Sequence, residues 1–319
     1  MQVFDSLEDI PRDFGPTVVS VGNYDGIHCA HQRLIQSVCA SAKELNARSV
    51  VATFDPHPSR VLRPHGGPPL ITPMGRKMEL LSETGLDAVV VIPFTRDLSL
   101  MPPFEFAEEV LYNRLHAIEV HEGFNFRFGH KAEGNMERLC EFGHRLGFTV
   151  VTHTPILSGE LVISSSNVRA VVLGGKVALA RHLLGRAFSI DSTPGRGRGY
   201  GTKYTVPTVN LARYDELTPS IGVYVTELQI NGELFQSVTN VGNRPTFGAE
   251  SFAIESYILN FHPIDLSSDT PIRLSFLHRL RTEKKFPSPE ALKEQIGRDV
   301  VRAQRYFRLR DGLRRTQKV

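Results

Sequence analysis

Short apolar runs alternate with amphipathic segments over the first half of the chain. The apolar runs predict five strands, at 17–21, 49–54, 88–92, 117–120 and 149–152. Apolar residues at helical spacing predict helices between them, at 32–46, 76–83, 104–115 and 132–146. This alternation predicts a Rossmann-like α/β domain with a parallel sheet, whose ligands bind beyond the carboxyl ends of the strands.

The pattern changes in the second half, where short alternating runs are separated by Gly, Asn, Asp and Pro. These runs predict strands at 205–211, 223–230, 236–241, 253–260 and 272–279, which indicate a small antiparallel β-barrel. A helix is expected from Ser288, with an apolar stripe of Leu292, Ile296, Val300, Ala303 and Phe307. We place the boundary near residue 186, which gives domains 1–185 and 186–319.

Composition limits the class of protein. Hydrophobic residues make up 41% of the 319 residues and charged residues 22%, which predicts packed cores without long disorder. Cys29, Cys39 and Cys140 have no metal-like spacing and fit a reducing compartment. The chain starts without a signal-like segment and contains no apolar stretch of about 20 residues. We therefore expect a cytoplasmic protein that has no membrane partner.

Net charge is only +3, and the basic excess is concentrated between Arg302 and Lys318. A basic terminal helix can bind nucleic acid, but a solvated helix face explains the same pattern. Nucleic acid is therefore not an expected partner, and self-association stays open.

The first candidate site follows the strand at 17–21. Glycines in the turn allow close backbone approach to a ligand, and His28 and His31 follow where a helical pattern begins. A strand that leads through glycines into a helix N-terminus is typical of phosphate sites, which predicts contact with the phosphates of ATP. The candidate phosphate-binding residues of the turn are Gly22, Asn23, Asp25 and Gly26. A zinc site (with His57 and His65) and two merely exposed histidines are the alternatives.

Three further segments of the first half follow predicted strands or precede a helix. In 53–59, prolines hold Asp55 and His57 in a rigid polar loop. In 123–129, three Phe residues alternate with Asn125 and Arg127, a pattern that suits either a flavin ring or a core strand. In 163–169, hydroxyls and a guanidinium can cap a helix or clamp phosphates; the residues are Ser164, Ser165, Ser166 and Arg169.

The second half carries three candidate features. Gly195, Gly197 and Gly199 form a basic glycine-rich loop, which suits either phosphate binding or a flexible connector. Thr208 and Asn210 lie two apart, on one side of a strand, where their oxygens can coordinate Mg²⁺. Glu255 interrupts a largely apolar strand, as either an outward-facing residue or a general base.

Together these segments resemble, in order and over nearly the whole chain, the bacterial bifunctional riboflavin kinase/FAD synthetase family. In the first half the signatures are 22–31, 53–58, 124–129 and 163–169. In the second half they are the glycine-rich loop, 207–210, 240–248, Glu255 and 280–286. The resemblance implies that ATP and FMN react in the first domain, and that riboflavin is phosphorylated in the second.

The resemblance also implies residue roles. His28 and His31 would contact ATP and the transition state, Asn125 would orient flavin or nucleotide, and the 164–169 segment would hold triphosphate. Thr208 and Asn210 would bind Mg²⁺–nucleotide, Glu255 would deprotonate the ribityl hydroxyl, and Arg281 would lie near the ligands. We assign Asp55, His57 and Arg127 to the flavin as well.

The chain departs from the family's usual pattern at four positions. Ala30 and Thr205 stand where Gly is usual, Ser166 where Thr is usual, and Thr202 where Arg is usual. The favoured hypothesis is a two-step enzyme that uses ATP and Mg²⁺ to convert riboflavin to FMN and FMN to FAD. Retention of the kinase activity alone, and a non-catalytic regulator that binds flavin or nucleic acid, are the alternatives.

Overall fold

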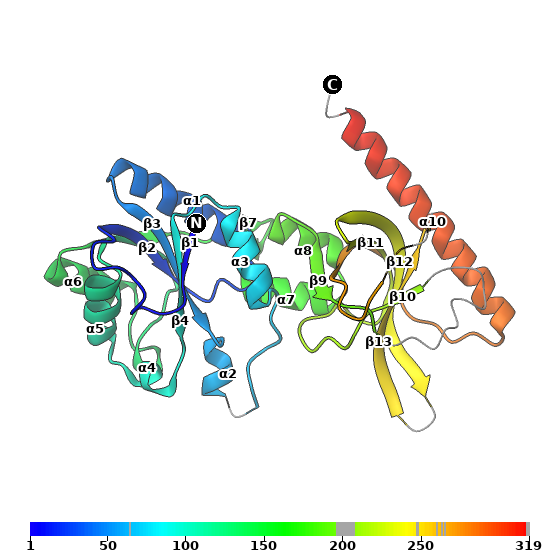
Figure 1. Cartoon of the computed structure of the whole chain (residues 1–319), viewed down its shortest axis with the longest axis horizontal. Coiled ribbons are helices and arrows are strands. Elements are labelled where there is room, and N and C mark those ends of the chain that lie inside the picture. Colours follow the sequence, from blue (N-terminus) through cyan, green and yellow to red (C-terminus); the bar gives the residue numbers. More distant parts are fainter. Residues whose placement is uncertain are drawn as a thin grey trace. The chain divides into compact units, whose positions relative to one another are not determined.

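Two units of different architecture, Met1–Asn167 and Val168–Val319, make up the chain in the computed structural model (Figure 1). The structure describes all residues except 64, 196–207, 247–248, 260, 263, 265 and 317–319. Only the backbone is described at 243–246, 249–251 and 314–316. The expected separation of the two activities at residue 186 stays a prediction.

A six-stranded sheet forms the centre of the first unit, and every neighbouring pair in it is parallel. Its strands are β1 (Gln2–Phe4), β2 (Thr17–Val21), β3 (Arg48–Asp55), β4 (Ala88–Pro93), β5 (Ala117–Gly123) and β6 (Thr149–His153). The predicted strands and the parallel sheet are confirmed; β1 was not predicted. In the order β1-β4-β3-β2-β5-β6, the chain reverses direction across the sheet between β2 and β5. Ligands of such sheets bind at this switch point.

Helices cover both faces of this sheet. On one face, α1 (Cys29–Glu44) and α3 (Met74–Ser82) pack on apolar residues of β2, β3 and β4. On the other, the π-helix η1 (Phe106–Arg114) and α6 (Met136–Leu146) close a second core. Shorter helices lie in the connections: α2 (Pro58–Leu62), α4 (Arg96–Leu100), α5 (Pro103–Glu105) and the 3₁₀-helix η2 (His130–Ala132).

Two of the helix predictions need correction. The helix expected at 104–115 is present as α5 followed by a π-helix, in which Leu115 N donates to Val110 O, five residues back. The helix expected from residue 132 begins at Met136, because Asn135 caps it and Gly134 pairs with Phe128 instead.

The second unit is built on a six-stranded antiparallel sheet in the order β10-β13-β12-β11-β14-β9. Its strands are β9 (Phe188–Ser192), β10 (Thr208–Asn210), β11 (Gly222–Ile230), β12 (Glu233–Thr246), β13 (Ala249–Ile258) and β14 (Ile272–Arg281). The two outer strands meet just beyond their ends, where Pro194 pairs with Leu211. Gly195 N donates to Asn210 O, and Ala212 N to Thr193 O, both at 2.8 Å. The predicted small barrel is thereby confirmed.

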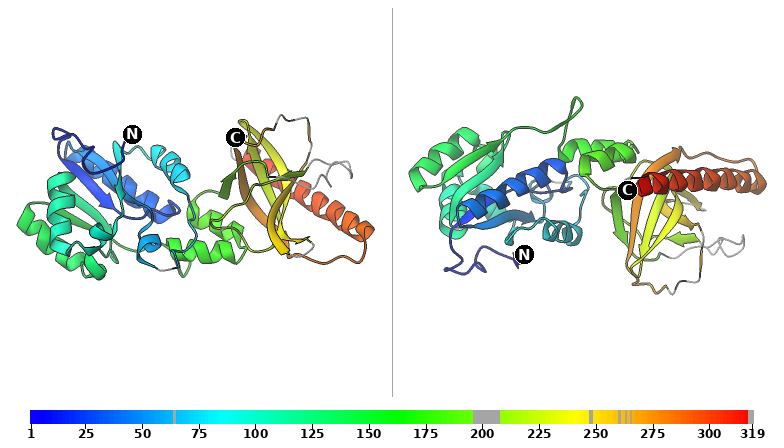
Figure 2. Two further views of the ribbon diagram at one scale, coloured as in Figure 1. Left: turned by 60° about the horizontal axis from the view of Figure 1, so that its bottom comes forward. Right: turned by 90° about the horizontal axis from the view of Figure 1, so that it is seen from above.

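A long helix, α10 (Pro289–Thr316), runs along this sheet (Figure 2). Ala303 and Phe307 are buried against Val223 and Val225. The predicted stripe is correct for these turns but wrong for the first two, because Leu292 and Ile296 are 42% and 38% exposed. The basic side chains Arg302, Arg305 and Arg308 are exposed.

The remaining elements connect the two sheets in sequence. They are the hairpin β7 (Leu157–Ser158) and β8 (Leu161–Val162), followed by α7 (Ser165–Leu173) and α8 (Val177–Leu184). Among the described residues, no helix has the length and apolar character needed to cross a bilayer.

Candidate active sites

The turn after β2 leaves the sheet at the switch point and has an unusual backbone. Gly26 has φ +93°, and a side chain there would press on Ile71 at 3.1 Å, so the position favours glycine. Tyr24 and Ile27 also have positive φ, +47° and +37°. Non-glycine residues held in this region are energetically costly and occur preferentially at ligand sites. The backbone of this turn is therefore typical of a ligand site rather than of a turn that only connects two elements.

Asp25 anchors this turn from within the protein. Its side chain is 1% exposed and accepts hydrogen bonds from Ile71 N at 2.9 Å and Thr72 N at 3.0 Å. Gly26 N in turn donates to Thr72 Oγ1 at 2.9 Å. The carboxylate thus supports the turn, whereas Asn23 is exposed at its tip. Direct contact of Asp25 with phosphate stays a prediction.

The two predicted histidines lie together at the N-terminus of α1. His28 is the N-cap, and its Nδ1 accepts the His31 N–H at 3.3 Å. The two rings stack with centroids 3.6 Å apart, and His31 also packs on Tyr24. Ala30, in the first turn, has helical backbone. Two imidazoles at the positive end of a 16-residue helix form an environment that favours an anion.

The serine segment reaches the same turn from 140 residues further along the chain. Ser165 Oγ donates to Asp25 O at 2.8 Å. Ser164 Oγ accepts the Asn167 N–H at 3.3 Å, so it also caps α7, and Ser166 is exposed. Arg169 follows one turn later in α7. The structure therefore brings the serines and the histidine turn together; contact of Arg169 with triphosphate stays a prediction.

Asp55 is the last residue of β3, and His57 follows two residues later. Because β3 is the neighbour of β2, both lie at the same edge of the sheet. Asp55 is exposed. His57 caps α2, since its Nδ1 accepts the Ser59 N–H at 3.2 Å. The cap gives His57 a structural role that is independent of any ligand.

Asn125 and Arg127 are exposed in the turn that follows β5, on the other side of the switch point. The three Phe residues that alternate with them differ in burial. Phe128 is 6% exposed in the core, and Phe126 stacks on it at 5.3 Å. Only Phe124 of the three is exposed, at 52%. The core reading is thus correct for two of the rings, and the polar residues stay available for a ligand.

Two buried ionisable residues at this edge were missed by the sequence analysis. Lys77 of α3 is 5% exposed, and Glu122 of β5 is 4% exposed. Burial raises the pKa of Glu122 well above its ordinary range and lowers the pKa of Lys77. Neither residue stood out in the sequence, because Arg76 directly precedes Lys77 and His121 directly precedes Glu122.

Glu122 lies in a fork between the two strands of the switch point. Pairing of β2 with β5 extends to Val19 and Val120. Two residues further on, the Val21 N–H donates to Glu122 Oε1 at 2.6 Å. A side chain thus replaces the backbone partner and lets the strands separate where a ligand would enter. The strand predicted to end at Val120 in fact continues to Gly123.

In the second unit, strand register brings Thr208, Asn210 and Glu255 to one face of the sheet. Asn210 pairs with Glu255, and Glu255 pairs with Asn240 on its other side. Side chains of directly paired residues lie about 5 Å apart. Thr208 is two residues before Asn210 and shares its face. A carboxylate beside amide and hydroxyl oxygens is a donor set that fits Mg²⁺.

The other predicted residues of this unit have different outcomes. Gly195 packs against β10, where a side chain would meet Leu211 O at 2.5 Å. Gly197 and Gly199, with Thr202 and Thr205, lie outside the described residues. Arg281 forms an ion pair with Asp299 of α10 at 2.8 Å. Its contact with a ligand stays a prediction.

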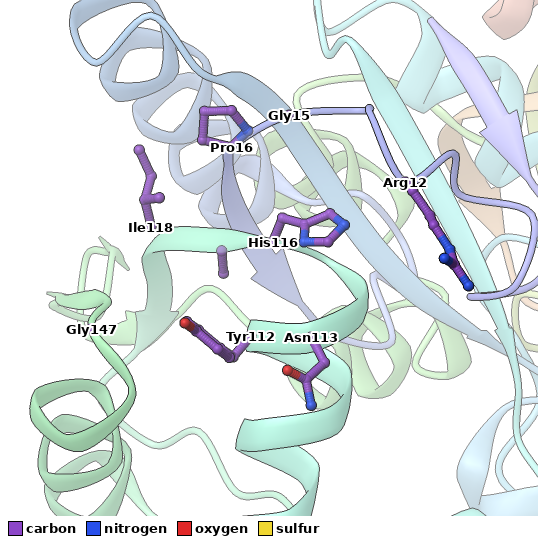
Figure 3. A pocket seen from close by; sticks show the side chains of 9 residues that line it. Arg12, Gly15, Pro16, Tyr112, Asn113, His116, Ile118 and Gly147 are labelled. Atoms are coloured by element: carbon purple, nitrogen blue, oxygen red, sulfur yellow. The ribbon is translucent and has the colours of Figure 1, made fainter.

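A separate cavity of about 440 Å³ lies at the opposite edge of the first sheet (Figure 3). Its lining includes Pro16, His116 and Ala117, which flank the amino ends of β2 and β5. None of the predicted site residues lines it. Within the described residues, no three His, Cys, Asp or Glu side chains are grouped to hold a metal ion.

Comparison with known families divides the chain in the same order. Residues 10–167 match the model of the FAD synthetase family, and residues 184–307 match that of riboflavin kinase.

Relatives described as bifunctional riboflavin kinase/FMN adenylyltransferase extend over almost the whole chain. The Escherichia coli K12 protein is 30% identical, over 92% of this chain and 93% of its own length. The protein from Buchnera aphidicola of Acyrthosiphon pisum is 28% identical, over 97% and 99%.

Among solved structures, one from Streptococcus pneumoniae, described as a macrolide-efflux protein, is similar in fold. It has a TM-score of 0.85 and 25% identity, and the match covers 95% of this chain and 98% of that one.

Proposed function

The chain belongs to the bifunctional riboflavin kinase/FMN adenylyltransferase family, and we propose that each unit carries one of the two reactions. The enzyme phosphorylates riboflavin to FMN and adenylylates FMN to FAD. The second unit is assigned the kinase reaction and the first unit the adenylyl transfer. The register of Asn210 with Glu255 and the Ser165–Asp25 hydrogen bond carry the residue assignments.

In the kinase reaction, Glu255 acts as the general base. Its carboxylate takes the proton of the ribityl hydroxyl while that oxygen bonds to the γ-phosphorus of ATP and the bond to ADP breaks. Thr208 and Asn210, next to it, hold the metal–nucleotide. Bound Mg²⁺ would neutralise charge on the transferring phosphoryl group. The support for this role is the oxygen-rich row on one sheet face, formed by paired residues of three adjacent strands.

In the adenylyl transfer, a phosphate oxygen of FMN bonds to the α-phosphorus of ATP, and the bond to pyrophosphate breaks. His28, His31 and the N-terminus of α1 stabilise the negative charge that develops on the leaving group. Ser164, Ser165 and Ser166, of which Ser165 contacts the same turn, hold the triphosphate. Asn125, Asp55 and His57 orient the flavin substrate from the ends of β5 and β3. No residue of this set forms a covalent intermediate, so catalysis comes from positioning and charge.

The division of labour is tested with two single variants and three substrates. Purified protein is incubated with riboflavin, ATP and Mg²⁺, or with FMN, ATP and Mg²⁺, and the flavins are separated by chromatography. His31→Ala should lower FAD formation about 100-fold or more while FMN formation is kept. Glu255→Gln should lower FMN formation by a similar factor, while added FMN is still converted to FAD.

Matched controls separate these effects from general damage. His144 is an exposed histidine of α6, and Glu233 is an exposed glutamate of β12. His144→Ala and Glu233→Gln should leave both activities within about twofold. A folded His31→Ala or Glu255→Gln protein that has lost both activities would contradict the assignment of one reaction to each unit.

A further inference from the structure

We propose that Lys77 is a positioning residue for adenylyl transfer, whose buried ammonium fixes the turn after β2 and cancels the charge of Asp25. This inference rests on the proposed adenylyl transfer in the first unit. It concerns a residue that lies in α3, outside all the segments that identify the site in the sequence.

The first argument is the set of hydrogen bonds of the ammonium. Lys77 Nζ donates to Asn23 O at 2.7 Å and to Thr53 Oγ1 at 3.3 Å. Thr53 Oγ1 itself donates to Asn23 O at 3.3 Å. One side chain therefore joins α3 to the end of β3 and to the exposed tip of the turn. Lysine is almost never fully buried without such partners.

The second argument is that the turn and the α3 segment hold each other by hydrogen bonds in both directions. Asp25, in the turn, holds the backbone at Ile71 and Thr72, just before α3. Lys77, in α3, holds the backbone at Asn23, in the turn. The two contacts fix the turn on both sides of Tyr24, which has φ +47°. A backbone in a sparsely populated conformation persists only when its surroundings hold it so.

The third argument is charge. The carboxylate of Asp25 is buried within the turn that is to receive a polyphosphate. Coulomb repulsion between the carboxylate and the phosphates is weakly screened at a buried site. Burial lowers the pKa of Lys77, and attraction by the charges of Asp25 and Asp55 opposes part of that lowering. A cation at Lys77 therefore offsets the negative charge of Asp25, which weakens the repulsion of the phosphates.

A purely structural lysine would affect folding but would not single out ATP. The two roles separate in the steady-state kinetics of FAD formation from FMN and ATP, with the full-length protein. Lys77→Met keeps the aliphatic stem and removes the charge. We expect kcat/KM for ATP to fall at least about tenfold, because hydrogen bonds to a charged group are lost. The KM for FMN and the phosphorylation of riboflavin should stay within about twofold.

Lys43 of α1 supplies the matched control, because it is an exposed helical lysine of the same unit. Lys43→Met should leave both reactions unchanged within about twofold. Lys77→Arg retains the charge and should keep more FAD formation than Lys77→Met. Loss of near-ultraviolet circular dichroism would show that Lys77→Met is not correctly folded. In that case Lys77→Arg, and the double variant of Lys77→Met with Asp25→Asn, test the role of Lys77 instead.

A double-mutant cycle with Asp25→Asn tests charge cancellation directly. Removing both charges should restore part of the lost kcat/KM for ATP. The kcat/KM of the double variant should therefore be at least about fivefold higher than the value predicted by multiplying the two single effects. Effects that simply multiply would overturn the role of Lys77 against Asp25. If Lys77→Met raised the KM for FMN as much as the KM for ATP, a role at the phosphates of ATP would be overturned. A wild-type protein that makes no FAD would instead overturn the proposed adenylyl transfer itself.

Discussion

Glu122 shows how a single side chain shapes the switch point. Its carboxyl accepts the Val21 N–H and a longer hydrogen bond from Ser20 Oγ at 3.4 Å, while Tyr24 OH donates to Ser20 Oγ at 2.6 Å. This chain of bonds connects the fork between β2 and β5 with the tyrosine on which His31 packs. The candidate adenylyl site is therefore connected by hydrogen bonds to a buried residue at the carboxyl end of β5.

The buried carboxyl of Glu122 should make the stability of the first unit depend on pH. Burial raises its pKa in the folded protein above the ordinary value of 4.5, so between these two values the folded state binds more protons than the unfolded state. Stability contributed by Glu122 is therefore complete below pH 4.5 and falls as the pH rises towards the folded pKa. Glu122→Gln keeps an acceptor for Val21 N–H and has no such dependence.

Calorimetric unfolding of the wild type and Glu122→Gln between pH 4 and pH 8 provides the measurement. The difference in midpoint should move in favour of Glu122→Gln as the pH rises. Glu133→Gln, an exposed glutamate of the same unit, should show no such trend. If the unfolding midpoint of the wild type rose relative to that of Glu122→Gln with rising pH, the ionised carboxylate would be the favoured form in the fork.

At the residue scale, the sequence predicted what lies near the ligand edge better than what lies beneath it. His28, His31 and the serines follow recognisable turn and cap patterns, and the structure brings them together. Lys77 and Glu122 were missed because their importance depends on burial and on partners far along the chain. The role of Asp25 as an anchor depends on Ile71 and Thr72 in the same way.

Among the elements, α10 carries two ion pairs that differ in burial. Arg281 of β14 and Asp299 of α10 pair at 2.8 Å, with side chains that are 13% and 2% exposed. Gln295 Nε2 donates to the second oxygen of Asp299. Arg298 and Glu294 form another pair on the same helix, but their side chains are 53% and 70% exposed. The two pairs are alike in chemistry and differ in burial.

Removal of Asp299 should therefore cost much more than removal of Glu294. Asp299→Ala leaves the Arg281 guanidinium buried without its partner, which typically lowers the free energy of unfolding by about 3 kcal/mol. Glu294→Ala should change it by less than about 1 kcal/mol, because exposed pairs are screened. Urea-dependent hydrogen exchange of β11 and β14 peptides measures both. Similar losses in the two variants would contradict the importance of burial here.

Periodicity predicted five strands of each sheet, because a buried or half-buried run is visible as a local pattern, but it missed β1 and β9. It predicted less well where tertiary contacts decide the outcome. The π-helical pattern of η1 and the exposure of Leu292 and Ile296 depend on what each helix packs against. Gly134 pairs with Phe128, six residues earlier, and this contact delays the start of α6.

For the whole molecule, the sequence order of the motifs is also the order of the two units. The histidine turn, Asp55, Asn125 and the three serines lie within Met1–Asn167. Thr208, Asn210, Glu255 and Arg281 lie within Val168–Val319. Only Arg169 of the proposed adenylyl residues lies beyond the division. From the motif order we expect one reaction in each half of the chain, whereas the sequence carries no signal for how FMN passes from one reaction to the next.

Because nearly every residue of each proposed site lies within one unit, two differently impaired chains should complement each other. We expect His31→Ala protein to release FMN, and Glu255→Gln protein to convert that FMN to FAD. A mixture of the two, supplied with riboflavin, ATP and Mg²⁺, should therefore form FAD after a lag in which free FMN accumulates. Each variant alone is the control and should form about 100-fold less FAD than the wild type. A mixture that accumulates FMN without forming FAD would show that FMN must pass between the units of a single chain.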